Sequence, residues 1–393
     1  MKENRNLDNI KAVCISDDLA GYDPYDIWMT GIGIQIKSLF NKNKYVGLLP
    51  AAALTLYDHF INNNARLFYK KREYPTARAM AALTLFNIYK IEKKDEYLEF
   101  GKRHVDWLIE HSCKGYAGLC WGLGFKWAVG EGLDYNENTP FSTHTPYALE
   151  AIHAYIQITN DSEYIQHIES IFTFYENDIK VLFEDSDEMA TSYGPAKDRL
   201  VTNAVSYTMY AYAIFLGYFP DKKEIIKKRI GKLYNFIKNS QRNDGSWLYS
   251  PEDKNSFIDC FHSCFVLKNI YKTHKILPLK DAQKTMAMGY DYLKLNFYDS
   301  KDGLFKRFSL SNKPSIIKYD LYDNAEFLHF AVLFGDHDFA KKLATSIGVK
   351  FRKGDDIYSV IDTFNFRKNK NTLRWAKMPY LYALSALELD YHG

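Results

Sequence analysis

The residues best suited to chemistry are Asp259 and His262, which stand three positions apart in the segment IDCFHSCF. Two side chains at that spacing on a helix share a face. A carboxylate beside an imidazole orients the ring and raises its basicity, which suits a general base. Two other interpretations compete with this one: a capping Asp beside a core histidine bonded to backbone, and a metal site.

A second polar cluster, made of Tyr319, Asp320, Asp323 and Asn324, falls at the start of another predicted helix. Two carboxylates on one face are typical of the acid and base of glycoside hydrolysis. They are also what the dipole favours at any helix N-terminus, and this simpler interpretation is slightly preferred. Tyr319 is a candidate proton donor, a role that Tyr often takes in uronate lyases and epimerases.

Two arginines stand where a helix dipole disfavours a cation. Arg374 begins the last predicted helix, and Arg78 begins an early one. Bidentate pairing with a uronate or phosphate would explain such placement. An internal ion pair with an Asp of the N-terminal segment would explain it equally well. His144 also begins a predicted helix and is a further candidate, although a single histidine is more often structural.

Aromatic residues gather in the predicted loops. Sugar rings present apolar C–H faces that stack on aromatic planes, so these side chains are candidate sugar contacts, although aromatics also anchor loops onto helices. The candidates are Trp121, Trp127, Trp247 and Tyr249. The motif GYDPYD (21–26) precedes the helices, and its Tyr22 and Asp23 are candidates to close a funnel or contact a ligand.

The elements that must position these residues are helices. The 393 residues include only 21 Gly and 11 Pro, a shortage of turn formers that favours long helices over many strands. Apolar periodicity predicts six helix pairs. The first members are 46–64, 95–112, 162–184, 221–240, 280–297 and 337–350, and the second members are 76–91, 143–159, 199–218, 257–273, 318–334 and 373–390.

The two sets of helices differ in charge. First members carry charge on one face, as in DKKEIIKKRIGKLYNF, whereas second members such as TNAVSYTMYAYAIF are almost free of it. A helix that is apolar on all sides must be buried on all sides. Two concentric rings satisfy both patterns, so we expect an all-α (α/α)6 toroid over residues 46–393, with 1–45 as an N-terminal segment packed on it. A linear solenoid is the alternative.

The loops within pairs mix turn residues with aromatics, as in LCWGLGFKW, NDGSWLYS, KDGLFKRFS and DIYSVIDTFNFR, and each is expected to form a short hairpin. All of them fall where the inner helices begin. The sequence therefore predicts a funnel with an aromatic rim, around helix N-termini that favour anionic groups.

Composition excludes several classes of protein. The 51 Lys and Arg balance 48 Asp and Glu, which gives no electrostatic case for nucleic acid. There is no long apolar run for a membrane span, and the polar start MKENRNLDNIK gives no sign of a signal peptide. Five Cys without a CxxC pair predict no disulfide framework, so a cytoplasmic location is expected. No GxGxxG or P-loop is present, so no cofactor is predicted, and the oligomeric state stays open.

Seven landmarks together resemble a family of uncharacterised six-hairpin proteins encoded among bacterial surface-polysaccharide genes for capsule, O-antigen or exopolysaccharide. They are GYDPYD (21–26), CWGLGFKW (120–127), Thr145-Pro146, QRNDGSW (241–247), IDCFHSCFVL (258–267), YDLYDNAEFL (319–328) and RWAKMPYLYALSAL (374–387). This resemblance implies a toroid and a glycan setting. Asn203 stands where the family carries an Asn, whereas Ser263 and Cys264 depart from its usual Thr-Gly.

Two more distant resemblances bear on chemistry. The fold class is similar to that of glucuronyl C5-epimerases, unsaturated-uronide hydrolases and polysaccharide lyases. QRNDGSW and the stretch from Asp259 also resemble repeats of prenyltransferase β subunits, including the surroundings of a zinc-ligand histidine. The Asp-x-Cys of that zinc site is missing from the preceding predicted inner helix, so we interpret both stretches as toroid architecture.

The leading hypothesis is a cofactor-independent carbohydrate-active enzyme that uses acid and base chemistry on an acidic sugar. In it, His262 is the base or acid, Asp259 orients it, Tyr319 or Asp320 is the partner, and Arg374 binds the anion. The alternatives are a non-catalytic glycan-binding or scaffold protein of polysaccharide assembly, and a zinc toroid that handles prenyl chains.

Overall fold

Six buried helices form the centre of the structure, a computed structural model that describes residues 11–130, 133–196, 199–253, 256–311 and 315–392. Residues 1–10, the start of the predicted N-terminal segment, lie outside the described residues. The helices are α5 (Pro75–Glu92), α7 (Thr145–Thr159), α9 (Thr202–Phe215), α11 (Cys260–Ile276), α13 (Leu321–Phe334) and α15 (Met378–His392). Every residue of α9 is buried, as its lack of charge predicts.

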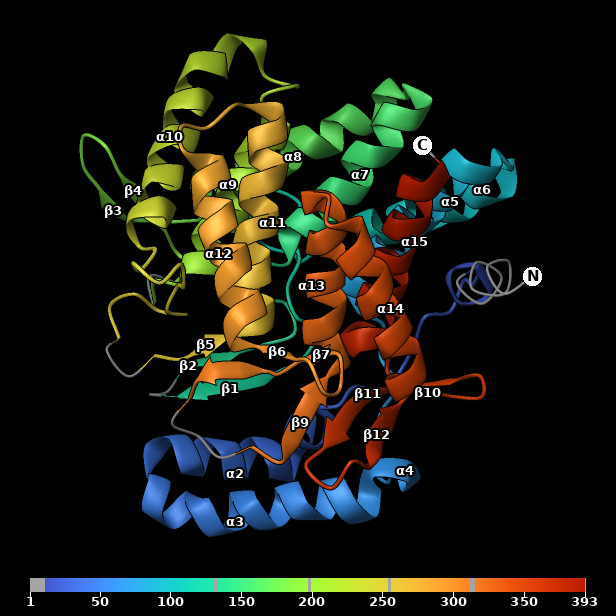
Figure 1. The fold of residues 1–393 in the computed structure, drawn as a ribbon. Helices are drawn as coiled ribbons and strands as arrows, with labels where there is room; N and C mark the ends of the chain where they lie inside the picture. Colours follow the sequence, from blue (N-terminus) through green and yellow to red (C-terminus); the bar gives the residue numbers. More distant parts are fainter. Residues whose placement is uncertain (1–10, 131–132, 197–198, 254–255, 312–314, 393) are drawn as a thin grey trace.

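The six inner helices close into a ring. Each packs against the next along the chain, and α15 packs against α5, so the last helix meets the first (Figure 1). A linear solenoid would leave those two ends apart. The predicted toroid is therefore confirmed, and the predicted inner segments match the helices to within a few residues at each end.

The outer layer consists of helices with one apolar stripe. They are α6 (Asp95–Glu110), α8 (Ile165–Asn177), α10 (Lys223–Asn239), α12 (Ala282–Asn296) and α14 (His337–Phe351). On α10, Ile226, Ile230, Leu233 and Ile237 are buried at helical spacing while most of the lysines face outward. The predicted helix 162–184 is too long, because α8 ends at Asn177 and a strand follows.

The predicted first outer helix, 46–64, is helical but lies elsewhere. It comprises α3 (Lys44–Leu56), the π-helical turn η2 (Tyr57–Asn62) and α4 (Asn63–Ala65), after η1 (Asp26–Met29) and α2 (Gly31–Lys42). Helix α3 packs against α2 as a hairpin below the loop rim, not against the ring (Figure 1). The two helices approach closely at Gly47, where a Cβ would lie 2.2 Å from the Cα of Phe40.

Short antiparallel strands form the rim at the N-terminal ends of the inner helices (Figure 1). They are β1 (Trp127–Gly130), β2 (Leu133–Tyr135), β3 (Val181–Glu184), β4 (Met189–Thr191), β5 (Ile258–Asp259), β6 (Tyr298–Asp299), β7 (Leu304–Phe305), β8 (Phe308–Leu310), β9 (Ile317–Asp320), β10 (Arg352–Lys353), β11 (Asp356–Asp362) and β12 (Arg367–Lys370). Three of the four expected hairpin loops contain strands, whereas 243–250 is built from turns and bends.

Two ion pairs join inner helices of the ring, the first of them buried and the second partly buried. Lys268 of α11 pairs with Glu326 of α13, and both side chains are almost fully buried. Lys272, one turn further along α11, places its Nζ 2.6 Å from Glu150 of α7. A buried charge is tolerated only when it is paired, so each partner requires the other. Among the described helices, none has the length and apolar character needed to cross a bilayer.

Candidate active site

A cavity of about 540 Å³ opens at the N-terminal ends of the inner helices, under the rim strands. Most of its wall is aromatic: Tyr25, Phe125, Trp127, Tyr135, Phe141, Tyr147, Tyr193, Tyr207, Tyr249, Phe257, Phe261, Phe265, Tyr322 and Trp375. The other lining residues are Thr76, Leu123, Thr143, His144, Arg199, Asn203, His262, Arg307 and Arg374. The wall thus carries three guanidinium groups, and no Asp or Glu lines it among the described residues.

His262 enters this cavity with one ring nitrogen already engaged. Its Nδ1 lies 2.7 and 2.9 Å from the two carboxylate oxygens of Asp259. A carboxylate at that position keeps the proton on Nδ1 and leaves Nε2 with a lone pair. His262 therefore lines the cavity with Nε2 not engaged by Asp259, and its role as a base stays a prediction.

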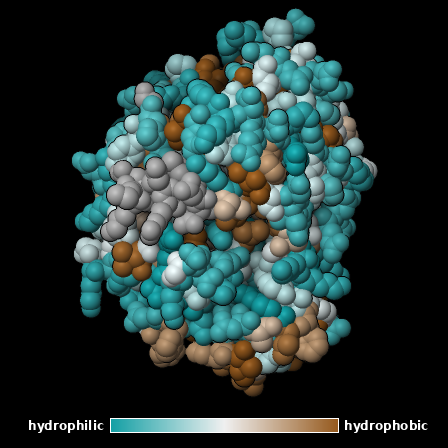
Figure 2. Space-filling model, turned by 90° about the vertical axis from the view of Figure 1, so that its right-hand side faces the viewer, coloured by the Kyte–Doolittle hydropathy of each residue, from teal (hydrophilic) through white to brown (hydrophobic). Residues whose placement is uncertain are grey.

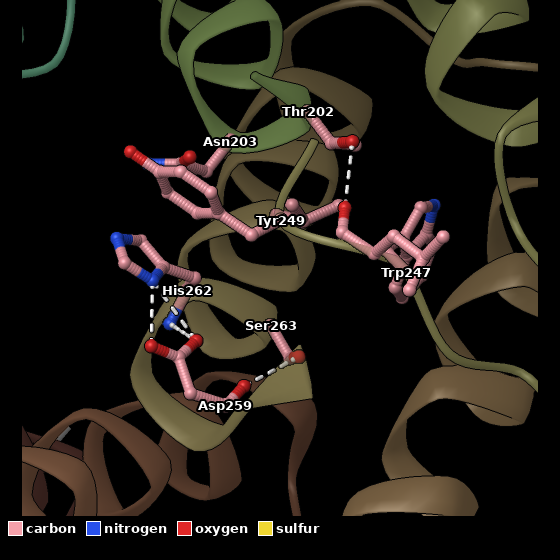
Figure 3. Close-up of a pocket in the computed structure, with 9 residues that line it drawn as sticks. Thr202, Asn203, Trp247, Tyr249, Asp259, His262 and Ser263 are labelled. Carbon is pink, nitrogen blue, oxygen red and sulfur yellow. Dashed lines mark hydrogen bonds and ion pairs between the residues drawn. The ribbon is translucent and has the colours of Figure 1, made fainter. Parts of the chain in front are cut away.

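Asp259 also begins helix α11. Its extended backbone makes it the N-cap, and its carboxylate accepts a hydrogen bond from the backbone N–H of His262 at 3.3 Å. The carboxylate is buried and lines the small pocket of Figure 3, which shares His262, Asn203 and Tyr249 with the larger cavity. Asp259 thus both caps α11 and contacts the imidazole, because the same carboxylate serves the helix and the ring.

The outer nitrogen of His262 shares its surroundings with Tyr249 and Asn203. Figure 3 shows this nitrogen pointing away from Asp259, on the side where the Tyr249 ring and the Asn203 amide lie. The Tyr249 ring centroid is 4.6 Å from that of His262. The amide oxygen of Asn203 is buried and has no hydrogen-bond partner among the described residues. It is an acceptor available to a ligand hydroxyl.

Arg374 is fixed in the wall by the N-terminal segment. Its Nε lies 2.7 Å from Asp23 Oδ2, and its guanidinium carbon lies 5.3 Å from the centroids of the Tyr74 and Phe125 rings. The internal ion pair with an Asp of the N-terminal segment is present, and the guanidinium also lines the cavity, so pairing with a uronate or phosphate stays a prediction. Asp23 itself does not line the cavity.

Arg307 and Arg199 complete the cationic part of the wall, and sequence analysis missed both. Arg307 donates to the hydroxyl of Tyr25 at 3.0 Å and to Asp320 at 3.3 Å. The Arg199 guanidinium carbon lies 4.6 Å from the centroid of the Tyr193 ring. Both are single arginines in loops, without a partner at helical spacing, so no local pattern marks them.

His144 lines the cavity as a neutral imidazole. Burial, together with the positive charge of Arg374, lowers its pKa to about 3. Its Nδ1 lies 3.1 Å from the hydroxyl of Thr143. A neutral histidine can donate a proton at one nitrogen and accept one at the other. The structure thus brings together two predicted histidines, His144 and His262, in one cavity.

Buried tyrosines form the deeper part of the wall. The hydroxyls of Tyr147 and Tyr207 lie 2.6 Å apart, and the Tyr322 ring stacks on Trp375 with centroids 4.0 Å apart. Burial raises the pKa of Tyr147, Tyr207 and Tyr322 well above the ordinary value. These phenols therefore remain protonated and can donate hydrogen bonds.

Asp320 and Tyr319 do not reach the cavity. Asp320 caps α13 by accepting from the N–H of Tyr322 at 2.9 Å, and it accepts from the Trp375 indole at 3.0 Å. Burial raises its pKa, although Arg307 opposes this. The hydroxyl of Tyr319 lies 2.7 Å from both Asp299 and Asp302. The two carboxylates expected on one helix face, Asp320 and Asp323, both lie outside the cavity wall, since Asp320 ends strand β9 as the N-cap of α13 and Asp323 is buried in the first turn of that helix.

Other predicted contacts are core residues. Asp323 accepts from the N–H of Phe261 at 3.0 Å, and Asn324 bonds both backbone groups of Phe305. Trp121 and Trp247 are buried, with indole N–H groups donating to backbone carbonyls at 2.8 Å. None of these four side chains lines the cavity. These side chains instead hold loops and helix ends in place. Of the other predicted aromatic contacts, Trp127 and Tyr249 do line the cavity.

Arg78 and Tyr22 also lie outside the cavity wall. Arg78 is buried among Glu73, His104 and the backbone of Asp17, where it joins the N-terminal segment to α5 and α6. Tyr22 is half-buried and lies 5.8 Å from the cations of Arg66 and Lys71. Arg78 forms an internal ion pair, but its partner is Glu73 and not the expected Asp of the N-terminal segment.

No group of three or more His, Cys, Asp or Glu side chains among the described residues is arranged to hold a metal ion. The zinc interpretation of Asp259 and His262 requires further ligands, and Asp259 already holds the imidazole. All five cysteines are free thiols, and only Cys113 is not fully buried.

Comparison with known proteins identifies the fold. No protein-family model and no curated sequence matches this chain. Solved structures do. Cellobiose 2-epimerase from Bacillus thermoamylovorans matches with a TM-score of 0.61 at 14% identity, over 89% of this chain and 100% of that one. A GH76 α-mannanase from Bacteroides thetaiotaomicron gives 0.59 at 12%, over 93% and 98%. A D-mannose isomerase gives 0.59 at 14%, over 81% and 87%. These likenesses establish the (α/α)6 fold.

Proposed function

We propose that this protein is a carbohydrate-active enzyme that moves a proton on an acidic sugar, as an epimerase, isomerase or lyase. The observation that carries the proposal is the composition of the cavity wall: an oriented His262, a neutral His144 and three guanidinium groups. Fold neighbours whose names describe sugar epimerases, isomerases and lyases support the same class.

The wall favours proton transfer over hydrolysis of a glycosidic bond. Hydrolysis by the common route needs two carboxyl groups that flank the bond. Among the described residues no carboxylate lines the large cavity, and Asp259 and Asp320 are already engaged by His262, Arg307 and Trp375. Proton abstraction needs a base that is effective near neutral pH, and an imidazole is such a base.

The residues of this chain fit the steps of such a reaction. His262 Nε2 takes a proton from the carbon next to a carboxylate or carbonyl, the C–H bond breaks, and its electron pair moves into that group. Arg374, Arg307 or Arg199 stabilises the negative charge that develops there. Returning a proton from the N–H of His144 to the opposite face of that carbon yields an epimer, and exchange with solvent restores both histidines. In a lyase the electron pair forms a C=C bond instead, the β C–O bond breaks, and the leaving oxygen takes the proton held by His262.

The aromatic wall and the unpaired oxygen of Asn203 suit a sugar rather than a prenyl chain. Tyr249, Trp127 and Trp375 offer flat faces to C–H groups, and buried phenols offer hydrogen bonds. The cluster of guanidinium groups calls for an anion such as a uronate. The motifs shared with proteins of bacterial surface-polysaccharide genes support a role in building or modifying such a glycan in the cytoplasm.

Deuterium exchange tests this proposal. The protein is incubated in D2O with uronate-containing oligosaccharides, and proton NMR follows each C–H signal. We expect one position to exchange, with exchange lost in His262→Gln. His153→Gln is the matched control, since His153 bonds Tyr218 outside the cavity wall at 2.7 Å and should not affect exchange. Saturable binding without exchange would instead indicate a glycan-binding scaffold, and new reducing ends without exchange would indicate a hydrolase.

A further inference from the structure

Helix α3 presents an apolar face to solvent. Between Lys44 and Asp58 the chain carries no charged residue, and a helix of that composition is normally buried. Here Tyr45 is 94% exposed and Leu49 is 78% exposed, with Val46, Leu48 and Leu56 exposed beside them. Soluble monomers seldom expose contiguous apolar surface of this kind without a partner.

The exposed surface continues onto two other segments. After α4, Leu67 and Phe68 are exposed, the latter by 90%. The turn between β11 and β12 adds Phe364 and Phe366, and the Phe364 ring lies 6.4 Å from that of Phe60 in η2. We call these residues of α3, η2, 67–68 and 364–366 the basal surface. More than half of the exposed large apolar side chains among the described residues lie on it or on α2, and Figure 2 shows apolar side chains along the bottom of the molecule.

The segments that carry the basal surface are fixed to one another. Asn63 donates to the side chain of Asn369 at 2.9 Å and accepts from its backbone N–H at 2.9 Å. His59 Nε2 lies 2.9 Å from Asp362 Oδ2. The surface is therefore a built part of the fold, held by buried polar contacts beneath exposed apolar side chains.

Cations accompany the basal surface. The exposed or partly exposed ones are Lys42, Lys44, Arg66, Lys70, Lys71, Arg367, Lys368 and Lys370. The two carboxylates in the same segments, Asp58 and Asp362, are buried and engaged by Tyr69 and His59. The surface therefore offers apolar and aromatic groups within a positive border, on a chain whose overall charge is only +3.

We propose that the basal surface docks this protein on an anionic lipid bilayer. Apolar side chains enter the boundary between headgroups and acyl chains, and the surrounding Lys and Arg side chains meet lipid phosphates. A second copy of the chain fits less well, because a two-fold contact through this surface would bring its positive border against itself. Helix α3 has 13 residues, which suits a helix lying on a bilayer better than one crossing it.

The position of the surface relates it to the cavity. Helix α2 packs against β1, and Lys37 Nζ lies 2.9 Å from the ring centroid of Trp127, which lines the cavity. One helical hairpin thus separates the sugar site from the docked bilayer. This placement suits a glycan attached to a membrane lipid, although the docking itself does not depend on the proposed function.

Vesicle sedimentation with the full-length protein tests the docking. We expect binding to vesicles of phosphatidylcholine with phosphatidylglycerol, and at least tenfold weaker binding to phosphatidylcholine alone or at high salt. Leu49→Glu combined with Phe68→Glu should weaken binding about tenfold or more. The matched control is Leu295→Glu on α12, an apolar residue that is 83% exposed and lies outside the basal surface, so it should leave binding unchanged.

Charge reversal separates lipid from protein partners. Lys42→Glu with Lys44→Glu should abolish the preference for anionic vesicles, while Lys227→Glu with Lys228→Glu on α10 should preserve it. Circular dichroism checks that each variant folds. The proposal is overturned if the wild type ignores anionic vesicles, or if it is a dimer by light scattering that Leu49→Glu converts to monomer without any vesicle binding.

Discussion

The Asp259 carboxylate lies 2.7 Å from Nδ1 of His262 and also accepts the backbone N–H of the same residue. One side chain therefore starts helix α11 and orients the imidazole that this helix presents to the cavity. The proposed base lies in the first turn of α11 and is held by the residue that caps this helix, so the helix and not a loop sets the position of His262.

Asp259→Asn should lower the rate of deuterium exchange by about 100-fold or more, because an amide no longer holds the Nδ1 proton and the correct tautomer. Asn caps a helix as well as Asp does, so the melting temperature should change little. NMR exchange rates and thermal unfolding measure the two effects. Asp161→Asn is the control, because Asp161 caps the short helix η3 (Ser162–Tyr164) and does not line the cavity. Normal exchange in Asp259→Asn would show that the pair only serves the fold.

Arg199→Gln should weaken binding of an acidic sugar about tenfold, since it removes a guanidinium group from the wall while keeping some hydrogen bonding. Binding of the corresponding neutral sugar should change less than about twofold, because no anion is involved. Isothermal titration calorimetry with the two sugars gives both values. Equal losses for both sugars would show that Arg199 shapes the cavity and does not recognise charge.

Acidification should destabilise the protein through its buried histidines. Burial lowers the pKa of His144 to about 3 and that of His104 to about 4, whereas an unfolded histidine titrates near 6.5. Below about pH 6.5 the unfolded chain binds more protons, so the free energy of unfolding falls as the pH falls. By pH 5 we expect a loss of about 2 kcal/mol for each histidine.

Urea unfolding at pH 7 and pH 5 measures this loss. His144→Asn should remove its share of the pH dependence, whereas His111→Asn, at an exposed position, should not. An unfolding free energy that is the same at both pH values would contradict the neutral state assigned to these imidazoles.

Lys268→Met should destabilise the ring by about 3–5 kcal/mol, because it leaves Glu326 as an unpaired buried charge. Adding Glu326→Leu should restore most of this loss, since both charges are then gone. Lys227→Met, which breaks the exposed pair with Glu224, should cost less than about 1 kcal/mol. Urea unfolding gives all three values, and additive effects of the first two substitutions would refute the direct pairing.

The ring could be predicted from the sequence because its buried inner helices contain few charged residues. A helix such as α9, without a charged residue, has no solvent face. The segment 46–64 was placed in the outer ring because it precedes the first inner helix, but order along the chain does not say which surface a helix packs on. Helix α3 shows the pattern of a buried helix while its face stays exposed on the basal surface.

The site could be predicted only where spacing sets direction. Asp259 and His262 are linked by helical geometry, so their contact followed from three positions of separation. Tyr319 and Asp320 were expected on a helix, but they form strand β9, where neighbours face opposite ways. For a loop tryptophan such as Trp121, no local pattern distinguishes a ring that faces the core from one that faces the cavity.

The pairing of Asp23 with Arg374 joins the segment before α2 to the segment before α15, across 351 positions of sequence. Until residue 374 has been synthesised, the Asp23 carboxylate lacks this arginine, and the cavity wall lacks both Arg374 and Trp375. The shape of the cavity wall is therefore complete only when segments far apart in the sequence have both been made and have come together.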